Sequence, residues 1–376
     1  MNSLEYHRKL KGKIEVISRA KIETREDLSL AYTPGVAEAC QAIVKDKEEL
    51  YALTRKNNLV AVVTDGSAVL GLGNIGAEAS LPVMEGKCVL FKEFANVDAV
   101  PIALKTQDVD EIVRTVELIS PIFGGINLED IAAPRCFEVE RKLADKLAIP
   151  VFHDDQHGTA IVVLAGLLNA LKVVNKKFAE VKIVINGAGA AGTAVTYLLL
   201  EAGAKNILLL DSRGIIFANR PALEEEKQKL ARLTNQKNQS GDLTEAMGGA
   251  DVFIGLSRPG LITEDMIRSM NKGAIIFAMA NPIPEIMPEL ARAAGAAVVA
   301  TGRSDFSNQV NNVLAFPGIF RGLLDARIKR VTMAMKLAAA LALAGLVTNP
   351  MAGMILPSPL NKEVSKVIAQ AVKDAV

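Results

Sequence analysis

The sequence contains no tryptophan, and aromatic residues make up only 4% of its 376 positions. So few aromatic side chains argue against the stacking surface that proteins use to bind single-stranded nucleic acid. The formal net charge is only +1, so the basic surface expected of a nucleic-acid or membrane-surface protein is also missing. We therefore expect a small-molecule ligand, no nucleic-acid partner and no membrane partner.

Cysteine is scarce as well. Cys40, Cys88 and Cys136 lie far apart, form no Cys-x-x-Cys pair and are odd in number, which disfavours a disulfide framework or a thiolate zinc site. Residues 1–13 are charged and polar, so we expect no secretory signal. The Ala- and Leu-rich run at 331–347 is interrupted by Lys336 and falls short of the ~20 apolar residues of a membrane span. These absences favour a cytoplasmic protein in which 331–347 is a buried helix.

The length exceeds the roughly 250–300 residues at which one hydrophobic core stops growing, so we expect two domains. Half of the residues are hydrophobic, which supplies enough core material. From residue 59 onward, β-branched runs alternate with stretches at helical spacing, the pattern of an α/β protein with a largely parallel sheet. In the first part we predict strands at 60–63, 88–91 and 97–104, and helices at 109–119 and 135–147.

The second part of the chain repeats this alternation. Segment 159–174 is apolar almost all round, which predicts a buried helix connecting the domains. Strands are predicted at 181–185, 207–210, 251–254, 274–279 and 297–300, with a helix at 188–202. This order indicates a doubly wound nucleotide-binding sheet. The polar segment 224–242 is either a solvated helix and loop or a flexible excursion.

The motif G-x-G-x-x-G occurs twice, so its context must decide which copy binds a dinucleotide. The copy at Gly187, Gly189 and Gly192 follows an apolar strand and opens a predicted helix, and Asp211 ends the next strand. Such glycines let the backbone and the positive helix end approach a pyrophosphate, while the acid binds a ribose hydroxyl. Asp211 favours NAD, although Arg213 could pair with the 2′-phosphate of NADP.

The other copy, at Gly71, Gly73 and Gly76, is followed by Pro82 and Gly86. We expect no comparable helix after it. A tight turn that brings backbone close to the substrate is the better interpretation.

Acidic residues follow two of the apolar stretches. Glu129 and Asp130 come after one, and Asp154 and Asp155 after another, which places both groups at the carboxyl ends of parallel strands, where α/β active sites form. Converging carboxylates favour a hard cation such as Mg²⁺ or Mn²⁺. Alternatively, Glu129 or Asp154 caps a helix and the others are solvated.

Two histidines near these acids offer a different metal. His153 and His157 are four residues apart and could bind zinc if the segment is helical, but no third histidine lies nearby.

Eight segments together resemble the malic enzyme family in order and spacing. They are YTPGV at 32–36, VTDGSAVLGLGNIG at 63–76, GK at 86–87, LED at 128–130, HDDQHGTA at 153–160, NGAGAAG at 186–192, ANP at 280–282 and NNVLAFPG at 311–318. The resemblance covers nearly the whole chain. It implies an amino-terminal α/β catalytic domain at 1–157, completed by carboxy-terminal helices at 313–376, and a Rossmann NAD(P)-binding domain at 158–312.

The resemblance also implies a site. The family's metal ligands fall on Glu129, Asp130 and Asp155, its catalytic residues on Lys87 and Tyr32, and its substrate contacts on Asn281 and Asn312, with Asn311 the alternative to Asn312. Its cofactor contacts fall on Gly187, Gly189, Ala190, Ala191, Gly192, Asp211 and Asn281. The implied reaction is metal-dependent oxidative decarboxylation of (S)-malate to pyruvate and CO₂ with NAD, or NADP, as hydride acceptor.

These roles make chemical sense. Lys87 would take the proton of the malate C2 hydroxyl as hydride leaves, and Tyr32 would then protonate C3. As a base, Lys87 needs a pKa well below about 10.4, and we expect burial or a neighbouring cation to lower it. The plainer alternatives are that Lys87 only binds a substrate carboxylate and that Tyr32 is a packed or interfacial residue.

One departure concerns the substrate anchor. Larger family members carry an arginine in the segment matching 66–73, where this chain has Ser67-Ala68, which leaves Arg135 and Arg303 as candidates for binding the distal carboxylate.

Three competing functions stay open. A malolactic enzyme would use the same cofactor and metal but release lactate, an amino-acid dehydrogenase would not need the acidic cluster, and an inactive nucleotide sensor or scaffold could share the fold. The resemblance also implies a homodimer or higher oligomer, which can bring active-site residues across the subunit interface.

Overall fold

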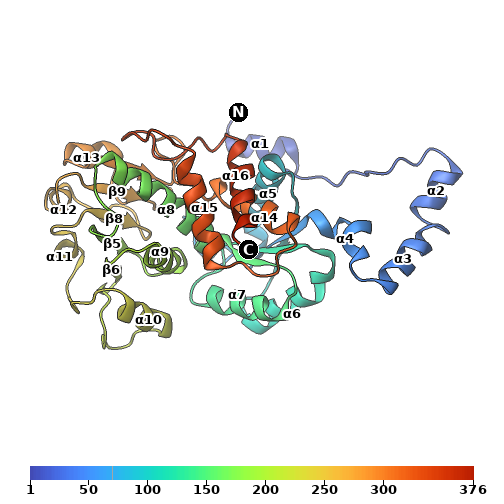
Figure 1. Cartoon of the computed structure of the whole chain (residues 1–376), viewed down its shortest axis with the longest axis horizontal. Coiled ribbons are helices and arrows are strands. Elements are labelled where there is room, and N and C mark those ends of the chain that lie inside the picture. Colours follow the sequence, from blue (N-terminus) through green and yellow to red (C-terminus); the bar gives the residue numbers. More distant parts are fainter. Residues whose placement is uncertain (70) are drawn as a thin grey trace.

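The computed structural model describes residues 1–69 and 71–376, which form two largely parallel sheets with helices packed around them. Figure 1 shows helices α8 and α15 between the strands of the second sheet on one side and helices α5, α14 and α16 on the other. The predicted α/β class with a Rossmann-type unit is confirmed.

The first sheet has four parallel strands in the order β2-β1-β3-β4. These are β1 (Leu59–Thr64), β2 (Asp98–Ala103), β3 (Gly125–Leu128) and β4 (Val151–His153). Helices α6 (Val109–Ile119) and α7 (Arg135–Lys146) connect them. Because Leu128 pairs with His153, the residues that follow β3 and β4 emerge side by side at one edge of the sheet.

Helix α5 (Gly76–Ala95) overturns two predictions. Residues 88–91, predicted as a strand, are helical, and the first glycine motif is followed by a helix despite Pro82. The physical reason is a face of buried residues at helical spacing, Met84, Cys88, Phe91 and Ala95, whose packing outweighs the single backbone bond that proline removes. The tight turn itself is confirmed, since all three glycines have positive φ.

The second sheet has six strands in the order β10-β9-β8-β5-β6-β7. They are β5 (Lys182–Asn186), β6 (Asn206–Asp211), β7 (Gly214–Ile215), β8 (Val252–Gly255), β9 (Ile275–Ala278) and β10 (Val298–Thr301). All neighbours are parallel except β6 and β7. This doubly wound order reverses between β5 and β8, and ligands bind at such a switch point. All five strands predicted for this part are confirmed.

The helices of the second sheet are α9 (Ala190–Glu201), α10 (Glu225–Leu233), α11 (Leu243–Met247), α12 (Glu264–Arg268) and α13 (Pro288–Ala293). The polar segment 224–242 therefore contains a helix and a loop.

Helix α8 (Asp154–Val173) follows β4 directly and packs against α9 and α15 (Met333–Gly345). Among the described helices, α8 is long and apolar enough to cross a membrane by length and composition, but most of it is buried inside the protein. Helix α15 is largely buried too, Lys336 included, as predicted. Helices α14 (Phe316–Asp325) and α16 (Glu363–Asp374) pack together, and α14 also contacts α5.

Four short helices precede the first strand, and the sequence patterns did not predict them. They are α1 (Ser3–Leu10), α2 (Arg25–Ala31), α3 (Val36–Lys45) and α4 (Glu49–Leu53), and none contains a buried residue. Figure 1 shows α2 and α3 as an arm that projects from the rest of the chain. Short 3₁₀ turns, η1 (Arg55–Asn58), η2 (Ser120–Ile122) and η3 (Asn312–Leu314), complete the fold.

Candidate active site

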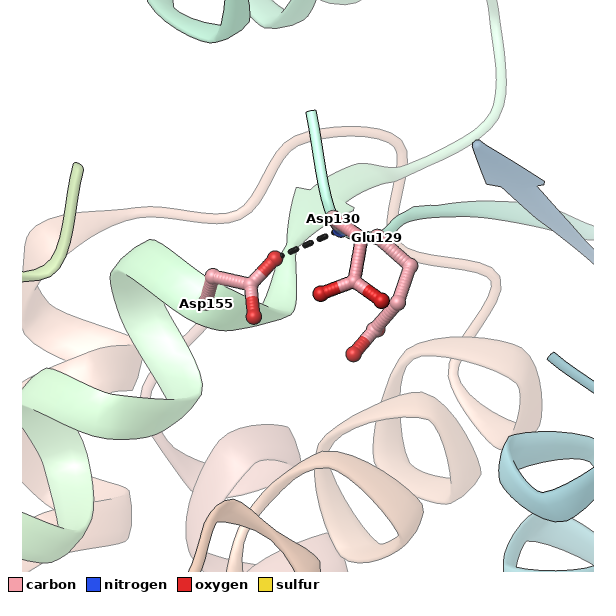
Figure 2. Close-up of side chains that lie close together, drawn as sticks. All are labelled: Glu129, Asp130 and Asp155. Carbon is pink, nitrogen blue, oxygen red and sulfur yellow. Dashed lines mark hydrogen bonds between the residues drawn. The ribbon is translucent and has the colours of Figure 1, made fainter. Parts of the chain in front are cut away.

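Three carboxylates converge at the edge where β3 and β4 end. Glu129 and Asp130 follow β3, and Asp155 lies in the first turn of α8. One oxygen from each lies within 4.8 Å of the others, and Figure 2 shows the three side chains grouped in this way. The backbone N–H of Asp130 donates to Asp155 Oδ2 at 2.8 Å. The predicted convergence of the two acidic groups is therefore confirmed.

The electrostatics of this cluster fit a hard cation. Burial, followed by the charges of Asp155 and Glu129, raises the pKa of Asp130 to about 9. Burial also raises the pKa of Glu129 and of Asp155. Asp130 Oδ2 is buried and has no hydrogen-bond partner among residues 1–69 and 71–376. A divalent cation with oxygen ligands, such as Mg²⁺ or Mn²⁺, would relieve both the mutual repulsion and the unpaired oxygen.

Lys87 enters this cluster from α5. Its Nζ lies 2.8 Å from Glu129 Oε1 and 2.6 Å from Asp154 Oδ2, and it sits 4.2 Å from the centre of the Phe316 ring on α14. The Lys87 side chain is buried, and that of Asp154 is fully buried. Asp154 is thus a partner of Lys87, a role that sequence reasoning missed. The only available signal was its position beside Asp155.

The protonation of Lys87 differs from the prediction. Burial lowers its pKa, but the charges of Asp154, Glu129 and Asp155 outweigh burial, so the pKa is raised. The expectation that its surroundings lower this pKa is therefore wrong for the metal-free chain, in which Lys87 carries a proton. Any ligand that offsets these carboxylate charges removes the cause of the upward shift.

The second glycine motif forms the loop between β5 and α9. Gly187 has φ +122°, and a Cβ at Gly192 would lie 1.7 Å from the Gly187 carbonyl oxygen, so both positions require glycine. A Cβ at Gly189 would meet nothing within 4 Å, which leaves open space beside its backbone. This division of roles among the three glycines is that of a dinucleotide-binding loop. Ala190 and Ala191 begin α9 directly behind it.

A cavity of about 690 Å³ lies in front of this loop and reaches Asp211. Asp211 Oδ1 accepts the Arg213 N–H at 2.9 Å, and its other oxygen is bound by Arg220 and lies 3.7 Å from Lys227 Nζ. Burial acts to raise the pKa of Asp211, but the hydrogen bond from Arg220 and the nearby charges hold it below its ordinary value. The acid that favours NAD is thus surrounded by cations that would tolerate the 2′-phosphate of NADP.

The two predicted asparagines approach the first sheet from the second. A Cβ at Gly71 would lie 2.8 Å from the Asn281 carbonyl oxygen, so the first glycine turn packs against the backbone of Asn281. Asn312 begins η3 and lies beside the first turn of α8, 3.2 Å from where a Cβ on Gly158 would be. The Asn311 side chain accepts the Val313 N–H at 2.9 Å and so caps η3. Its amide oxygen is therefore already engaged in a hydrogen bond.

Tyr32 lies elsewhere. It caps the C-terminal end of α2 and is 69% exposed, on the arm that Figure 1 shows projecting from the body. Within one chain, the structure brings Lys87 and the carboxylates together but leaves Tyr32 apart from them.

The two arginine candidates for the distal carboxylate differ in their surroundings. Arg135 pairs with Asp65 at 3.3 Å, and Asp65 follows β1 at the same sheet edge as the acidic cluster. Arg303 is occupied by Asp305, at 2.6 Å, and by the Pro282 carbonyl oxygen.

A glycine-loop Rossmann sheet facing a second parallel sheet with a lysine and a carboxylate cluster defines a two-domain, dinucleotide-dependent dehydrogenase. Comparisons with known proteins narrow this class. Residues 11–144 match the model of the malic enzyme N-terminal domain, and residues 156–376 match that of the malic enzyme NAD binding domain. The chain belongs to the malic enzyme family.

The most similar relatives include a bifunctional malic/malolactic enzyme from Bacillus subtilis, 56% identical over 99% of this chain and 92% of the relative. An NAD-dependent malic enzyme from Geobacillus stearothermophilus is 55% identical over 97% of this chain and 76% of the relative. Among solved structures, the NAD-dependent malic enzyme of Thermotoga maritima superimposes with a TM-score of 0.96 at 50% identity, over 99% of each chain.

Proposed function

We propose that this chain catalyses the oxidative decarboxylation of (S)-malate to pyruvate and CO₂, with NAD⁺ or NADP⁺ as the oxidant. The observation that carries the proposal is the placement of Lys87 within the carboxylate cluster, at the edge of the first sheet where the first glycine turn packs against Asn281. The family membership supports it, and relatives are named for either NAD or NADP.

Glu129, Asp130 and Asp155 would hold a Mg²⁺ or Mn²⁺ ion. Once bound, the ion would polarise the C2 oxygen of malate and stabilise the negative charge that develops there during oxidation and loss of CO₂. The dinucleotide would be bound by Gly187, Gly189, Ala190, Ala191, Gly192, Asp211 and Asn281, and it would supply the acceptor for the C2 hydride.

The chain's own groups handle the protons and the substrate. Once a ligand offsets the carboxylate charges and Lys87 has released its proton to solvent, the neutral Nζ would accept the proton of the C2 hydroxyl. Asp154 Oδ2, at 2.6 Å, orients Nζ. Asn281 and Asn312 would donate amide hydrogen bonds to malate. Arg135, already oriented by Asp65, is the better placed candidate for the distal carboxylate.

Tyr32 requires a second copy of the chain. The projecting arm exposes Leu28, Leu30, Tyr32, Val36 and Val44, and a lone chain gains nothing from exposing so many apolar side chains in one short segment. We propose that the protein is a homodimer or higher oligomer in which the arm docks on the partner. Tyr32 then supplies the C3 proton in the partner's active site.

We also propose the domain division 1–157 and 158–312, with 313–376 completing the first domain. The contact of Phe316 with Lys87 and the packing of α14 on α5 support this division. A cytoplasmic location is supported by the three cysteines, which are all free thiols in the described structure.

A malolactic reaction is the second candidate, favoured by the bifunctional malic/malolactic relative. It would use the same residues and release lactate without net reduction of the cofactor.

One assay separates these functions. Purified protein is incubated with malate and Mn²⁺, and with NAD⁺ and NADP⁺ separately, while absorbance at 340 nm, pyruvate and lactate are followed. Reduced cofactor and pyruvate in equal amounts, lost on addition of EDTA, are expected. Lactate without reduced cofactor would favour the malolactic reaction, and no product with either cofactor would contradict both.

A further inference from the structure

Two basic side chains of the interior have no part in the proposed reaction, and the structure links them. His157 lies on the first turns of α8, and Lys336 is the buried cation of α15. Lys336 Nζ lies 2.9 Å from His157 Nδ1, and His157 Nε2 lies 2.9 Å from Glu140 Oε1 on α7. Three helices from distant parts of the sequence, α7, α8 and α15, are thus linked by one series of hydrogen bonds through Glu140, His157 and Lys336.

The direction of the hydrogen bonds follows from the partners. An ammonium group has no acceptor and a carboxylate has no donor, so His157 accepts from Lys336 at Nδ1 and donates from Nε2 to Glu140. Burial opposes ionisation of Glu140, but its contacts with His157 and the charge of Lys336 lower its pKa to about 2. Burial lowers the pKa of His157, which favours the neutral imidazole. Burial lowers the pKa of Lys336 to about 8. A neutral imidazole therefore bridges a buried cation and a buried anion.

These contacts also argue against the zinc alternative. Both ring nitrogens of His157 are already bound, by Lys336 and Glu140. His153 precedes α8 rather than sharing a face of it. The pair therefore does not present two free nitrogens to one metal ion.

Glu140 connects this chain of contacts to the start of α8. Its Oε1 accepts the backbone N–H of His153 at 3.0 Å, and its Oε2 accepts from Gln156 Nε2 at 3.4 Å. The N-cap residue His153 makes no side-chain cap of its own, so a carboxylate from another helix stabilises this N-terminus. The next two residues are Asp154, which binds Lys87, and Asp155, which belongs to the acidic cluster.

We propose that Glu140 and Lys336, bridged by His157, are positioning residues that fix the first turn of α8 so that Asp154 and Asp155 meet Lys87 and the metal ion. The roles of Asp154 and Asp155 in this statement rest on the proposed function. The role of Glu140 and Lys336 in fixing the start of α8 does not rest on the proposed function, and it can be measured on protein without metal.

The variants Glu140→Gln and Lys336→Met each remove one charge at nearly constant volume. A matched pair at His157 tests the bridge itself. In His157→Gln the side-chain amide can still donate to Glu140 and accept from Lys336. The leucine of His157→Leu can do neither. Glu140, His157 and Lys336 border a cavity of about 1070 Å³, which Glu138 and Lys329 also line. Glu138→Gln and Lys329→Met are therefore the controls, and Glu138 pairs with Lys142 instead of joining the bridge.

The first readout is amide hydrogen exchange of residues 154–158 without metal. We expect faster exchange there in Glu140→Gln, Lys336→Met and His157→Leu, and wild-type exchange in His157→Gln and both controls. The second readout is Mn²⁺ affinity by titration calorimetry. Loss of a group that orients a metal ligand typically weakens metal binding about 10- to 100-fold. We expect a loss of Mn²⁺ affinity in the lower part of that range for Glu140→Gln, Lys336→Met and His157→Leu. The Tm of each variant is recorded as well.

Unchanged exchange at 154–158 in Lys336→Met and His157→Leu would overturn the proposal. So would a lower Tm with wild-type Mn²⁺ affinity, because that result describes a merely structural contact. If one variant does not fold, the comparison of His157→Gln with His157→Leu still decides. Wild-type protein that exchanges as expected but neither binds Mn²⁺ nor oxidises malate would leave the helix-fixing role standing and remove the proposed function.

Discussion

Lys87 illustrates how a residue's chemistry depends on the charges around it. In the metal-free chain its ammonium group compensates Glu129 and Asp154, and in the proposed reaction it accepts a proton. The carboxylates therefore keep Lys87 protonated while their charge is not offset. When a bound cation offsets that charge, they still orient the Lys87 side chain. Lys87 thus stabilises the carboxylate cluster by its charge, and it is the base only in the proposed reaction.

We predict that Lys87→Met lowers kcat by about 10²- to 10⁴-fold, the usual contribution of a general acid or base. Steady-state reduction of NAD⁺ by malate measures kcat, and NADH fluorescence titration should show unchanged cofactor binding. Lys92→Met on the same helix is the control, since Lys92 is half-exposed and pairs with Asp98. Loss of less than about threefold in Lys87→Met would show that Lys87 is not the base.

The raised pKa of Asp130 predicts a stability change with pH. Its folded pKa of about 9 lies far above the ordinary 3.8, so between these values the folded chain holds a proton that the unfolded chain has lost. Stability must then fall as pH rises. We expect metal-free protein to lose up to about 1 kcal/mol per pH unit between pH 7 and 8.5, a window above the ordinary histidine pKa.

Urea unfolding at several pH values with EDTA present measures this slope. Asp130→Asn should flatten it, and Mn²⁺ should remove it by keeping the carboxylates ionised in the folded state. A wild-type slope that is flat or positive in this window would contradict the assignment of a raised pKa to Asp130.

The sequence predicted where the acids lie but not how they behave. Residues that follow adjacent parallel strands must share an edge, so the meeting of Glu129, Asp130 and Asp155 required only the strand pattern. The ion pair of Lys87 with Asp154, and the direction of the Lys87 pKa shift, depend on distances between α5 and α8 that no spacing rule contains. The network of Glu140, His157 and Lys336 was hidden for the same reason.

At the scale of elements, the second glycine motif separates two kinds of requirement. Gly192 has no room for a Cβ against the Gly187 carbonyl, whereas Gly189 has open space beside it. We predict that Gly192→Ala displaces α9 from the loop, costs about 1–3 kcal/mol of stability and weakens NADH binding. Gly189→Ala should keep the wild-type Tm and still weaken NADH binding, because the added methyl group occupies the approach of the pyrophosphate.

Thermal unfolding and NADH fluorescence titration of the two variants test this contrast. Gly345→Ala serves as the control, because its Cβ would meet nothing within 4 Å and it lies at the end of α15. Wild-type NADH binding in Gly189→Ala would place the pyrophosphate elsewhere.

Helix α5 marks the limit of pattern reading at this scale. Residues 88–91 look like a strand because they are short and apolar, and short apolar runs do not distinguish strand from helix. What decides is the packing of one face of α5 beneath α14, including Phe91 against Phe316 and Phe320. The strands of the second sheet were predicted correctly because each is a short run of buried apolar residues that ends at a polar or glycine-rich segment.

At the scale of the molecule, the arm formed by α2 and α3 is the part that a single chain does not explain. Its helices bury no residue within the described chain, so contacts inside one chain do not account for its exposed apolar side chains. Tyr32 ends α2 on this arm, apart from the cluster that holds Lys87. Because most soluble oligomers are symmetric, an arm that reaches a partner's site implies that the partner's arm reaches back.

This reciprocity predicts complementation between two inactive variants. Tyr32→Phe and Lys87→Ala are each expected to lose activity as homodimers. In a mixed dimer, one site combines the intact Lys87 of one subunit with the intact Tyr32 of the other, while the second site lacks both. Co-expressed subunits that assort at random should therefore recover about a quarter of wild-type activity, since half of the dimers are mixed and each has one working site.

Differently tagged subunits and two-step affinity purification isolate the mixed dimer, whose malate oxidation should then approach about half of the wild-type rate per dimer. The control is a mixed dimer of Lys87→Ala with Lys87→Met, in which neither site has a base and no activity should return. If Tyr32 acts within its own subunit, every site in the mixed Tyr32→Phe and Lys87→Ala dimer lacks one group. Absence of recovered activity in that dimer would therefore place Tyr32 in the site of its own chain.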